Sequence, residues 1–127
     1  MIVVDASVIV DALVLQEPGL RKRLSVERLH APTLIDYEVL SALRGLTLGG
    51  HLSTARGVDA LADFATIPLT RHPASRDLQQ AAWALRDRLT AYDASYAVLA
   101  AAMGAPLWTR DARFAKAASA SVEVRVL

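Results

Sequence analysis

The sequence contains no cysteine among its 127 residues. This absence excludes a disulfide framework and a zinc site built from thiolates, and it fits a protein of a reducing compartment. A chain of this length can bury a hydrophobic core without such cross-links. We therefore expect one domain that spans residues 1–127.

Net charge and long apolar runs are scarce as well. Lys and Arg total 14 and Asp and Glu total 13, which leaves a formal net charge of +1. This excludes a strongly basic module that binds nucleic acid by bulk charge. It does not exclude a local basic groove, because the field depends on charge distribution.

The longest uncharged stretch, residues 94–109, contains Gly104 and Pro106 and is shorter than the ~20 residues of a membrane-spanning helix. No basic leader precedes Asp5, so we expect no signal peptide, no membrane association and a cytoplasmic location.

Two common catalytic motifs are also missing. There is no GxxxxGK[ST] loop, so Gly49 and Gly50 are interpreted as the end of a helix and not as a phosphate cradle. There is no G-x-S-x-G elbow to support a serine hydrolase. The three histidines, His30, His51 and His72, lie far apart and lack ligand spacing, so we interpret them as structural or surface residues.

Apolar residues, by contrast, are abundant: they make up 54% of the chain, and the mean hydropathy is +0.30. This surplus predicts either a dense core or an apolar surface reserved for a partner. Short apolar or alternating runs predict strands near residues 2–4, 29–31, 67–69, 106–108 and 122–126. Helical patterns predict helices near residues 7–15, 18–29, 34–47, 53–65, 76–88, 90–103 and 111–118. This alternation indicates an α/β fold with a parallel sheet covered by helices on both faces.

Three aspartates occupy positions where this sheet would bind a ligand. Asp5 and Asp111 each follow a predicted buried strand, and Asp93 lies in the first turn of a predicted helix. The carboxyl ends of parallel strands meet at one edge of a sheet, which is where ligands bind in open α/β folds. Each aspartate also has an alternative role as a helix cap, most clearly Asp93, which forms a Thr90-x-x-Asp capping box.

Glu38 has no such alternative. Asp36 already occupies the capping-box position after Thr33, and a pair with Arg44 does not fit the i, i+4 spacing. Glu38 lies, with Ala42, at the margin of the helix face that is predicted to enter the core, which comprises Ile35, Val39, Leu43 and Leu46.

Several carboxylates gathered at one edge would repel one another and raise their own pKa values. A hard divalent cation relieves that repulsion, and Mg²⁺ or Mn²⁺ suits an all-oxygen site, whereas zinc usually takes histidine or cysteine. Asp11, four residues after Ser7 on the first helix, could face the same site, although a solvated helix position is the simpler interpretation.

At these positions the sequence resembles the PIN domain, and specifically the VapC-type toxins of bacterial toxin–antitoxin pairs. The matching stretches are Ile2–Ile9, Ala31–Leu40, Tyr92–Tyr96 and Thr109–Phe114, and they follow the family's order along the whole chain. The resemblance implies a PIN-like three-layer α/β/α sandwich with a small central parallel sheet.

The resemblance also implies a function and a set of site residues. Asp5, Glu38, Asp93 and Asp111 would be the catalytic, metal-binding acids of an Mg²⁺- or Mn²⁺-dependent endoribonuclease. Ser7 and Thr109 match hydroxyl positions that support the site. Arg110 and Arg113 flank Asp111, and the planar guanidinium suits contact with RNA phosphates.

The expected partners are RNA, a VapB-type antitoxin that blocks the acidic site, and a second copy of the chain in a homodimer. Two alternatives stay open: a nuclease of RNA maturation or DNA cleavage on the same fold, and a catalytically silent PIN-like binding module. Phosphotransfer domains fit less well. A haloacid-dehalogenase-like site needs a second aspartate where Ser7 stands, and a receiver domain needs an acidic pair near Asp5.

Overall fold

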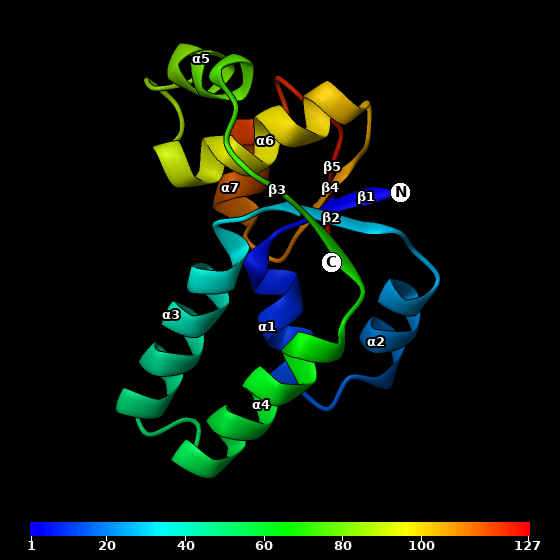
Figure 1. The fold of residues 1–127 in the computed structure, drawn as a ribbon, viewed down its shortest axis with the longest axis vertical. Helices are drawn as coiled ribbons and strands as arrows, with labels where there is room; N and C mark the ends of the chain where they lie inside the picture. Colours follow the sequence, from blue (N-terminus) through cyan, green and yellow to red (C-terminus); the bar gives the residue numbers. More distant parts are fainter.

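Five short parallel strands form one sheet in the computed structural model, which describes residues 1–127 (Figure 1). The strands are β1 (Ile2–Val4), β2 (Leu29–Pro32), β3 (Leu69–His72), β4 (Leu107–Thr109) and β5 (Val124–Val126). Their order across the sheet is β3-β2-β1-β4-β5, and every neighbouring pair is parallel.

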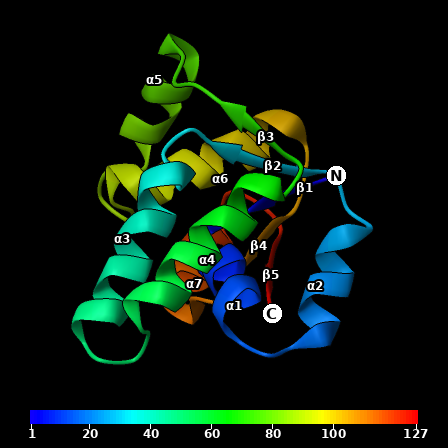
Figure 2. The same ribbon diagram turned by 60° about the horizontal axis from the view of Figure 1, so that its bottom comes forward.

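Helices cover both faces of this sheet, which confirms the predicted three-layer α/β/α architecture (Figures 1 and 2). One layer contains α1 (Ala6–Val14), α2 (Pro18–Ser25), α3 (Ile35–Leu48) and α4 (Thr54–Thr66). The other contains α5 (Arg76–Ala84), α6 (Ala91–Met103) and α7 (Ala112–Ala118). None of the helices combines the length and the apolarity that a bilayer crossing requires.

The chain reverses its direction across the sheet between β1 and β4. The first three strands run outward from β1 through β2 to the edge strand β3. The chain then returns to the other side of β1 and adds β4 and β5 there. Val4 pairs with Trp108, and the Asp5 amide donates to the Trp108 carbonyl at 2.9 Å. The residues that follow β1 and β4 therefore sit side by side at the switch point, where open α/β sheets bind their ligands.

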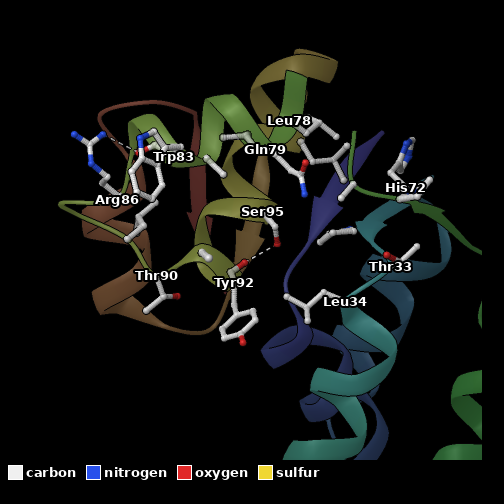
Figure 3. Close-up of a pocket in the computed structure, with 18 residues that line it drawn as sticks. Thr33, Leu34, His72, Leu78, Gln79, Trp83, Arg86, Thr90, Tyr92 and Ser95 are labelled. Carbon is white, nitrogen blue, oxygen red and sulfur yellow. Dashed lines mark hydrogen bonds between the residues drawn. The ribbon is translucent and has the colours of Figure 1, made fainter. Parts of the chain in front are cut away.

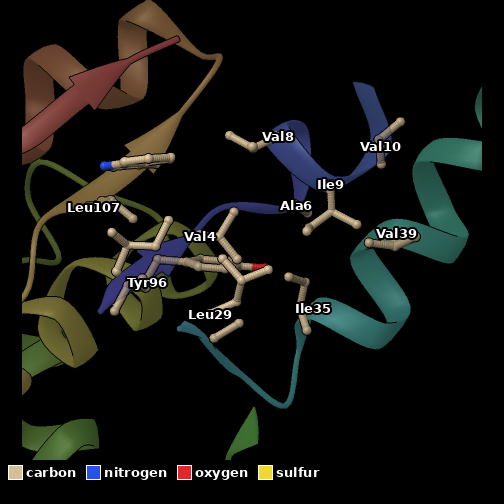
Figure 4. Close-up of a cluster of buried hydrophobic side chains, with 14 of the residues drawn as sticks. Val4, Ala6, Val8, Ile9, Val10, Leu29, Ile35, Val39, Tyr96 and Leu107 are labelled. Atoms are coloured by element: carbon tan, nitrogen blue, oxygen red, sulfur yellow. The ribbon is translucent and has the colours of Figure 1, made fainter. Parts of the chain in front are cut away.

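The core lies between the sheet and the helices on each face, and it comprises 29 buried apolar residues (Figure 4). All three residues of β1 are buried, as expected of a central strand with helices on both sides. The alanine-rich helix α6 contributes Ala94, Ala97 and Ala100, each without exposed surface. Alanine loses no side-chain entropy on burial, so α6 can pack closely on the sheet at little cost.

Several predicted boundaries are wrong. The second helix ends at Ser25 instead of residue 29, because residues 29–32 form β2. β3 begins at Leu69 and not at Ile67, since Pro68 has no amide hydrogen to donate to a neighbouring strand. The fifth helix ends at Ala84 and not at residue 88.

The predicted capping box at the start of α3 is also wrong. Leu34, not Thr33, occupies the cap position, and no side chain caps the helix. Asp36 instead pairs with Arg71 of β3, whose Nε donates to both carboxylate oxygens at 2.8 and 2.9 Å. This ion pair ties α3 to the edge strand, a contact between residues 35 positions apart that local sequence patterns do not reveal.

Removing a core side chain from the central strands should destabilise the fold strongly. Leu107 of β4 has no exposed surface, so Leu107→Ala should lower the free energy of unfolding by about 2–5 kcal/mol. Leu48→Ala at the exposed end of α3 is the control and should change it by less than about 0.5 kcal/mol. Urea denaturation measures both, and equal losses would contradict this description of the core.

Candidate active site

Asp5 follows β1 at the switch point, where two hydroxyl groups hold its carboxylate. Its Oδ2 accepts hydrogen bonds from Ser7 Oγ at 2.7 Å and from Thr109 Oγ1 at 2.8 Å. The side chain of Asp5 is only 8% exposed, and Thr109 is fully buried. Burial raises the pKa of Asp5, the charge of Asp111 raises it further, and the hydrogen bonds from Ser7 and Thr109 oppose this rise.

Ser7 and Thr109 also connect the ends of the two strands. Ser7 Oγ accepts from the Arg110 amide at 3.0 Å, and Thr109 Oγ1 accepts from the Asp111 amide at 3.0 Å. Each hydroxyl has one proton, so donation to Asp5 leaves its lone pairs free to accept from these amides. The positions after β1 and after β4 are therefore fixed relative to each other by side chains as well as by the sheet.

Glu38 and Asp93 bring two further carboxylates to this point, from α3 and from the first turn of α6. Glu38 lies at the margin of the buried face of α3, as predicted, and both side chains are half-buried. Burial raises the pKa of Glu38, and the charges of Asp5 and Asp93 add to this rise while Tyr96 opposes it. Burial also raises the pKa of Asp93, with further contributions from Asp5 and Asp111.

Helix capping accounts for the backbone amide of Asp93 but not for its carboxylate. Thr90 Oγ1 accepts from the Asp93 amide at 3.1 Å, but the Asp93 carboxylate makes no hydrogen bond in return. Asp111, in contrast, does cap α7: its Oδ1 accepts from the amides of Arg113 at 2.9 Å and Phe114 at 3.1 Å. Both of these bonds use Oδ1, which leaves Oδ2 available to another partner.

The four carboxylates line one open cleft of about 540 Å³, which we call the acidic cleft. Its walls come from α1, α3, the start of α6 and the loop after β4. They consist of Asp5, Ala6, Ser7, Val10, Asp11, Glu38, Ala42, Gly45, Leu46, Asp93 and Asp111. Residues separated by more than 100 positions in sequence thus meet in one place, as the parallel topology predicts.

The donor set of the acidic cleft fits a hard cation. No three of its side chains converge closely enough to ligate one ion as they stand. Their carboxylates nevertheless raise one another's pKa values, and Glu38 Oε1 is buried without a hydrogen-bond partner. Oxygen ligands of this kind suit Mg²⁺ or Mn²⁺, and a bound cation would relieve their repulsion.

Asp11 is not the solvated helix residue that the simpler interpretation of the sequence favoured. It lines the acidic cleft, and its Oδ2 accepts from Arg110 Nε at 2.8 Å. Arg110 also donates from its terminal nitrogens to Glu17 at 3.1 and 3.3 Å. The guanidinium of Arg110 is thus held by two carboxylates, whereas Arg113 is exposed; their contact with RNA stays a prediction.

Sequence reasoning missed two polar contacts near the sheet. Tyr96 of α6 lies in the core with its hydroxyl near Glu38, and its position three residues after Asp93 on one helix was the available signal. His30 and His72 form a hydrogen bond of 2.9 Å between Nδ1 and Nε2, across β2 and β3. They are structural residues, as predicted, but the pairing itself has no local sequence signal.

A second hollow of about 580 Å³, which we call the apolar groove, lies between α5, the start of α6 and the start of α3 (Figure 3). Figure 3 shows Trp83, Tyr92 and Leu34 around it. No aspartate or glutamate lines it. The apolar groove therefore has the character of a contact surface, whereas the acidic cleft has the chemistry of an active site.

The sequence and the fold match those of a known family. The family model of the PIN domain matches residues 2–120. Ribonuclease VapC9 of Mycobacterium tuberculosis is 39% identical over 127 residues, which cover 100% of this chain and 98% of that protein. Ribonuclease VapC3 of the same organism is 41% identical over 119 residues, which cover 91% of this chain and 86% of that protein. The chain belongs to the VapC family of PIN-domain proteins.

A solved structure agrees on the fold. The crystal structure of VapBC2 from Rickettsia felis, bound to a DNA fragment from its promoter, matches with a TM-score of 0.75 at 14% identity. The match covers 99% of this chain and 98% of that chain.

The raised pKa values predict how stability depends on pH in metal-free protein. Asp5, Glu38 and Asp93 have folded-state pKa values above their ordinary values of 3.8, 4.5 and 3.8. The folded state therefore favours their protonated forms, and their stabilising contribution is lost as the pH rises through the raised values. The stability of Asp5→Asn relative to wild type should accordingly increase from about pH 4 to about pH 8.

Urea denaturation in the presence of a chelator measures this difference. Asp59→Asn, on the exposed face of α4, is the matched control and should show no such trend. A difference between Asp5→Asn and wild type that does not change with pH would contradict the electrostatics described for the acidic cleft.

Proposed function

We propose that the protein is an Mg²⁺- or Mn²⁺-dependent endoribonuclease and the toxin of a VapBC toxin–antitoxin pair. The observation that carries this proposal is the set of four carboxylates gathered in the acidic cleft at the switch point of the sheet. The relatives named ribonucleases support RNA as the substrate, and its phosphodiester linkages would be cleaved by hydrolysis. We place this activity in the cytoplasm, where RNA is available.

Asp5, Glu38, Asp93 and Asp111 would hold the cation. When bound, such a cation would lower the pKa of a water molecule and neutralise the charge that develops on the scissile phosphate. Ser7 and Thr109 favour the ionised form of the buried Asp5 carboxylate and orient it through their two hydrogen bonds. Asp111 is oriented by the amides at the start of α7, so it presents its free oxygen without rearrangement.

The phosphate chain of RNA would enter the cleft along its open side. Arg113 is exposed one turn beyond Asp111 and could bind a phosphate as the protein stands. Arg110 would first have to leave Asp11 and Glu17. Phosphate contacts of this kind provide affinity and not sequence choice.

The proposed function includes two protein partners. A VapB-type antitoxin would cover the acidic cleft and block access of RNA to it. The similarity of the fold to that of VapBC2 from Rickettsia felis supports a partner of this kind. A second copy of the chain would cover the apolar groove. Trp83 and Tyr92 line this groove and are 67% and 63% exposed, so a second copy would bury their apolar surface.

Cleavage should depend on the metal and on Asp5. With a labelled RNA and Mn²⁺, Asp5→Asn should cleave at least about 100-fold more slowly than wild type, since it replaces a charged ligand. Chelation should abolish cleavage by the wild type, and Asp59→Asn should retain it. The products should carry 5′-phosphate and 3′-hydroxyl ends, because water attacks phosphorus as the bond to the 3′ oxygen breaks.

Fragments with a 2′,3′-cyclic phosphate would contradict a hydrolytic mechanism. Expression in cells without antitoxin separates the toxin from a silent binding module on the same fold. Wild type should arrest growth and Asp5→Asn should not; equal arrest by both proteins would refute a catalytic role for Asp5. Cleavage of DNA in preference to RNA would favour the DNA nuclease alternative.

Dimer formation should depend on the apolar groove. Truncation of a central aromatic at an interface typically costs 2 kcal/mol or more, which corresponds to a rise in the dimer Kd of about 30-fold for Trp83→Ala. Light scattering across a dilution series measures this Kd. Val58→Ala, an equally exposed apolar residue on α4, should leave it unchanged; a monomeric wild type would refute the dimer.

A further inference from the structure

The Tyr96 hydroxyl is a buried donor that the packing of the core does not require. Tyr96 has no exposed surface, and its Oη has no hydrogen-bond partner. Leaving a buried hydroxyl unsatisfied costs about 1–3 kcal/mol. A phenylalanine would fill the same space in the core without this cost, so the hydroxyl needs another explanation.

The position of Tyr96 beside the acidic cleft supplies an explanation for its buried hydroxyl. Tyr96 lies three residues after Asp93 on α6, and therefore on the same side of the helix. Its ring packs with Val4, Leu29 and Ile35 in the core, and its hydroxyl points toward Ile35 at the start of α3, beside Val4 at the end of β1 (Figure 4).

Glu38 presents the matching acceptor. Its Oε1 is also buried and also lacks a hydrogen-bond partner, while the residue lines the acidic cleft. Neither atom has a completed hydrogen bond. The two side chains are nevertheless neighbours: after burial, the nearby Glu38 carboxylate is the main cause that raises the pKa of Tyr96.

A tyrosine hydroxyl carries its proton at neutral pH, so toward an ionised carboxylate it can act only as a donor. Glu38 Oε1 is a buried acceptor near it that has no other partner.

We propose that Tyr96 is a positioning residue for the cation site: it donates a hydrogen bond to Glu38 Oε1 and thereby directs Oε2 into the acidic cleft. This inference rests on the proposed function, because it needs a cation in that cleft. Carboxylates that ligate metals are themselves held by hydrogen bonds from a surrounding layer of residues, and loss of such a partner typically lowers metal affinity 10- to 100-fold.

The test is calorimetric titration of Mn²⁺ into wild type, Tyr96→Phe and a matched control variant, with urea denaturation of each protein in metal-free form. The matched control is Tyr37→Phe, since Tyr37 lies beside Glu38 on α3 but is 75% exposed and lines neither the acidic cleft nor the apolar groove. The Kd for Mn²⁺ should rise at least about 10-fold in Tyr96→Phe and stay unchanged in Tyr37→Phe. Metal-free Tyr96→Phe should be as stable as wild type or more stable, because it buries no unsatisfied hydroxyl.

Each other outcome has a definite meaning. Equal Mn²⁺ affinity in wild type and Tyr96→Phe would overturn the positioning role and leave the proposed function intact. Loss of affinity together with a loss of metal-free stability would show that the hydroxyl serves the fold, and would also overturn it. A wild type that binds no Mn²⁺ would overturn the proposed function and this inference with it.

Discussion

The burial of the Asp5 carboxylate between β1 and β4 is the constraint on which the active site depends. A charged group is costly to bury unless hydrogen bonds compensate for the lost water. Two hydroxyls provide that compensation: Ser7 lies in the first turn of α1, just after β1, and Thr109 is the last residue of β4. The same hydroxyls accept from the amides of Arg110 and Asp111, so the buried charge and the local backbone stabilise each other.

The other three carboxylates lie around Asp5, and they differ in how far each one also caps a helix. Asp111 caps α7 with one oxygen, Asp93 shares in a cap only through its amide, and Glu38 has no structural role that the fold accounts for. Burial first, and then the charges of neighbouring carboxylates, raise the pKa values of Asp5, Glu38 and Asp93, so the metal-free cleft favours the protonated forms of these three residues. A bound cation would relieve the repulsion between these carboxylates, which nothing else in the fold compensates fully.

Much of this could be predicted from the sequence, because it depends on local patterns. Periodicity placed the strands and helices, and the parallel topology then brought Asp5 and Asp111 to one edge of the sheet. Glu38 lies in the acidic cleft, and its role there stays a prediction. One step toward that prediction was wrong, since Asp36 pairs with Arg71 and does not cap α3. What could not be predicted are contacts between distant residues: Arg110 with Asp11 and Glu17, His30 with His72, and Tyr96 with Glu38. These depend on the packing of helices against the sheet, which leaves no periodic signal.

The central claim, that the acidic cleft is a cation site built from carboxylates with raised pKa values, has one direct measurement. Titration of Mn²⁺ into the wild type at mildly acidic pH, repeated in buffers of different ionisation enthalpy, counts the protons released on binding. Carboxylates that are partly protonated in the metal-free protein must give up those protons to bind a cation. The account predicts saturable binding with net proton release that diminishes as the pH is raised. Absence of binding, or binding without proton release at any pH, would contradict it.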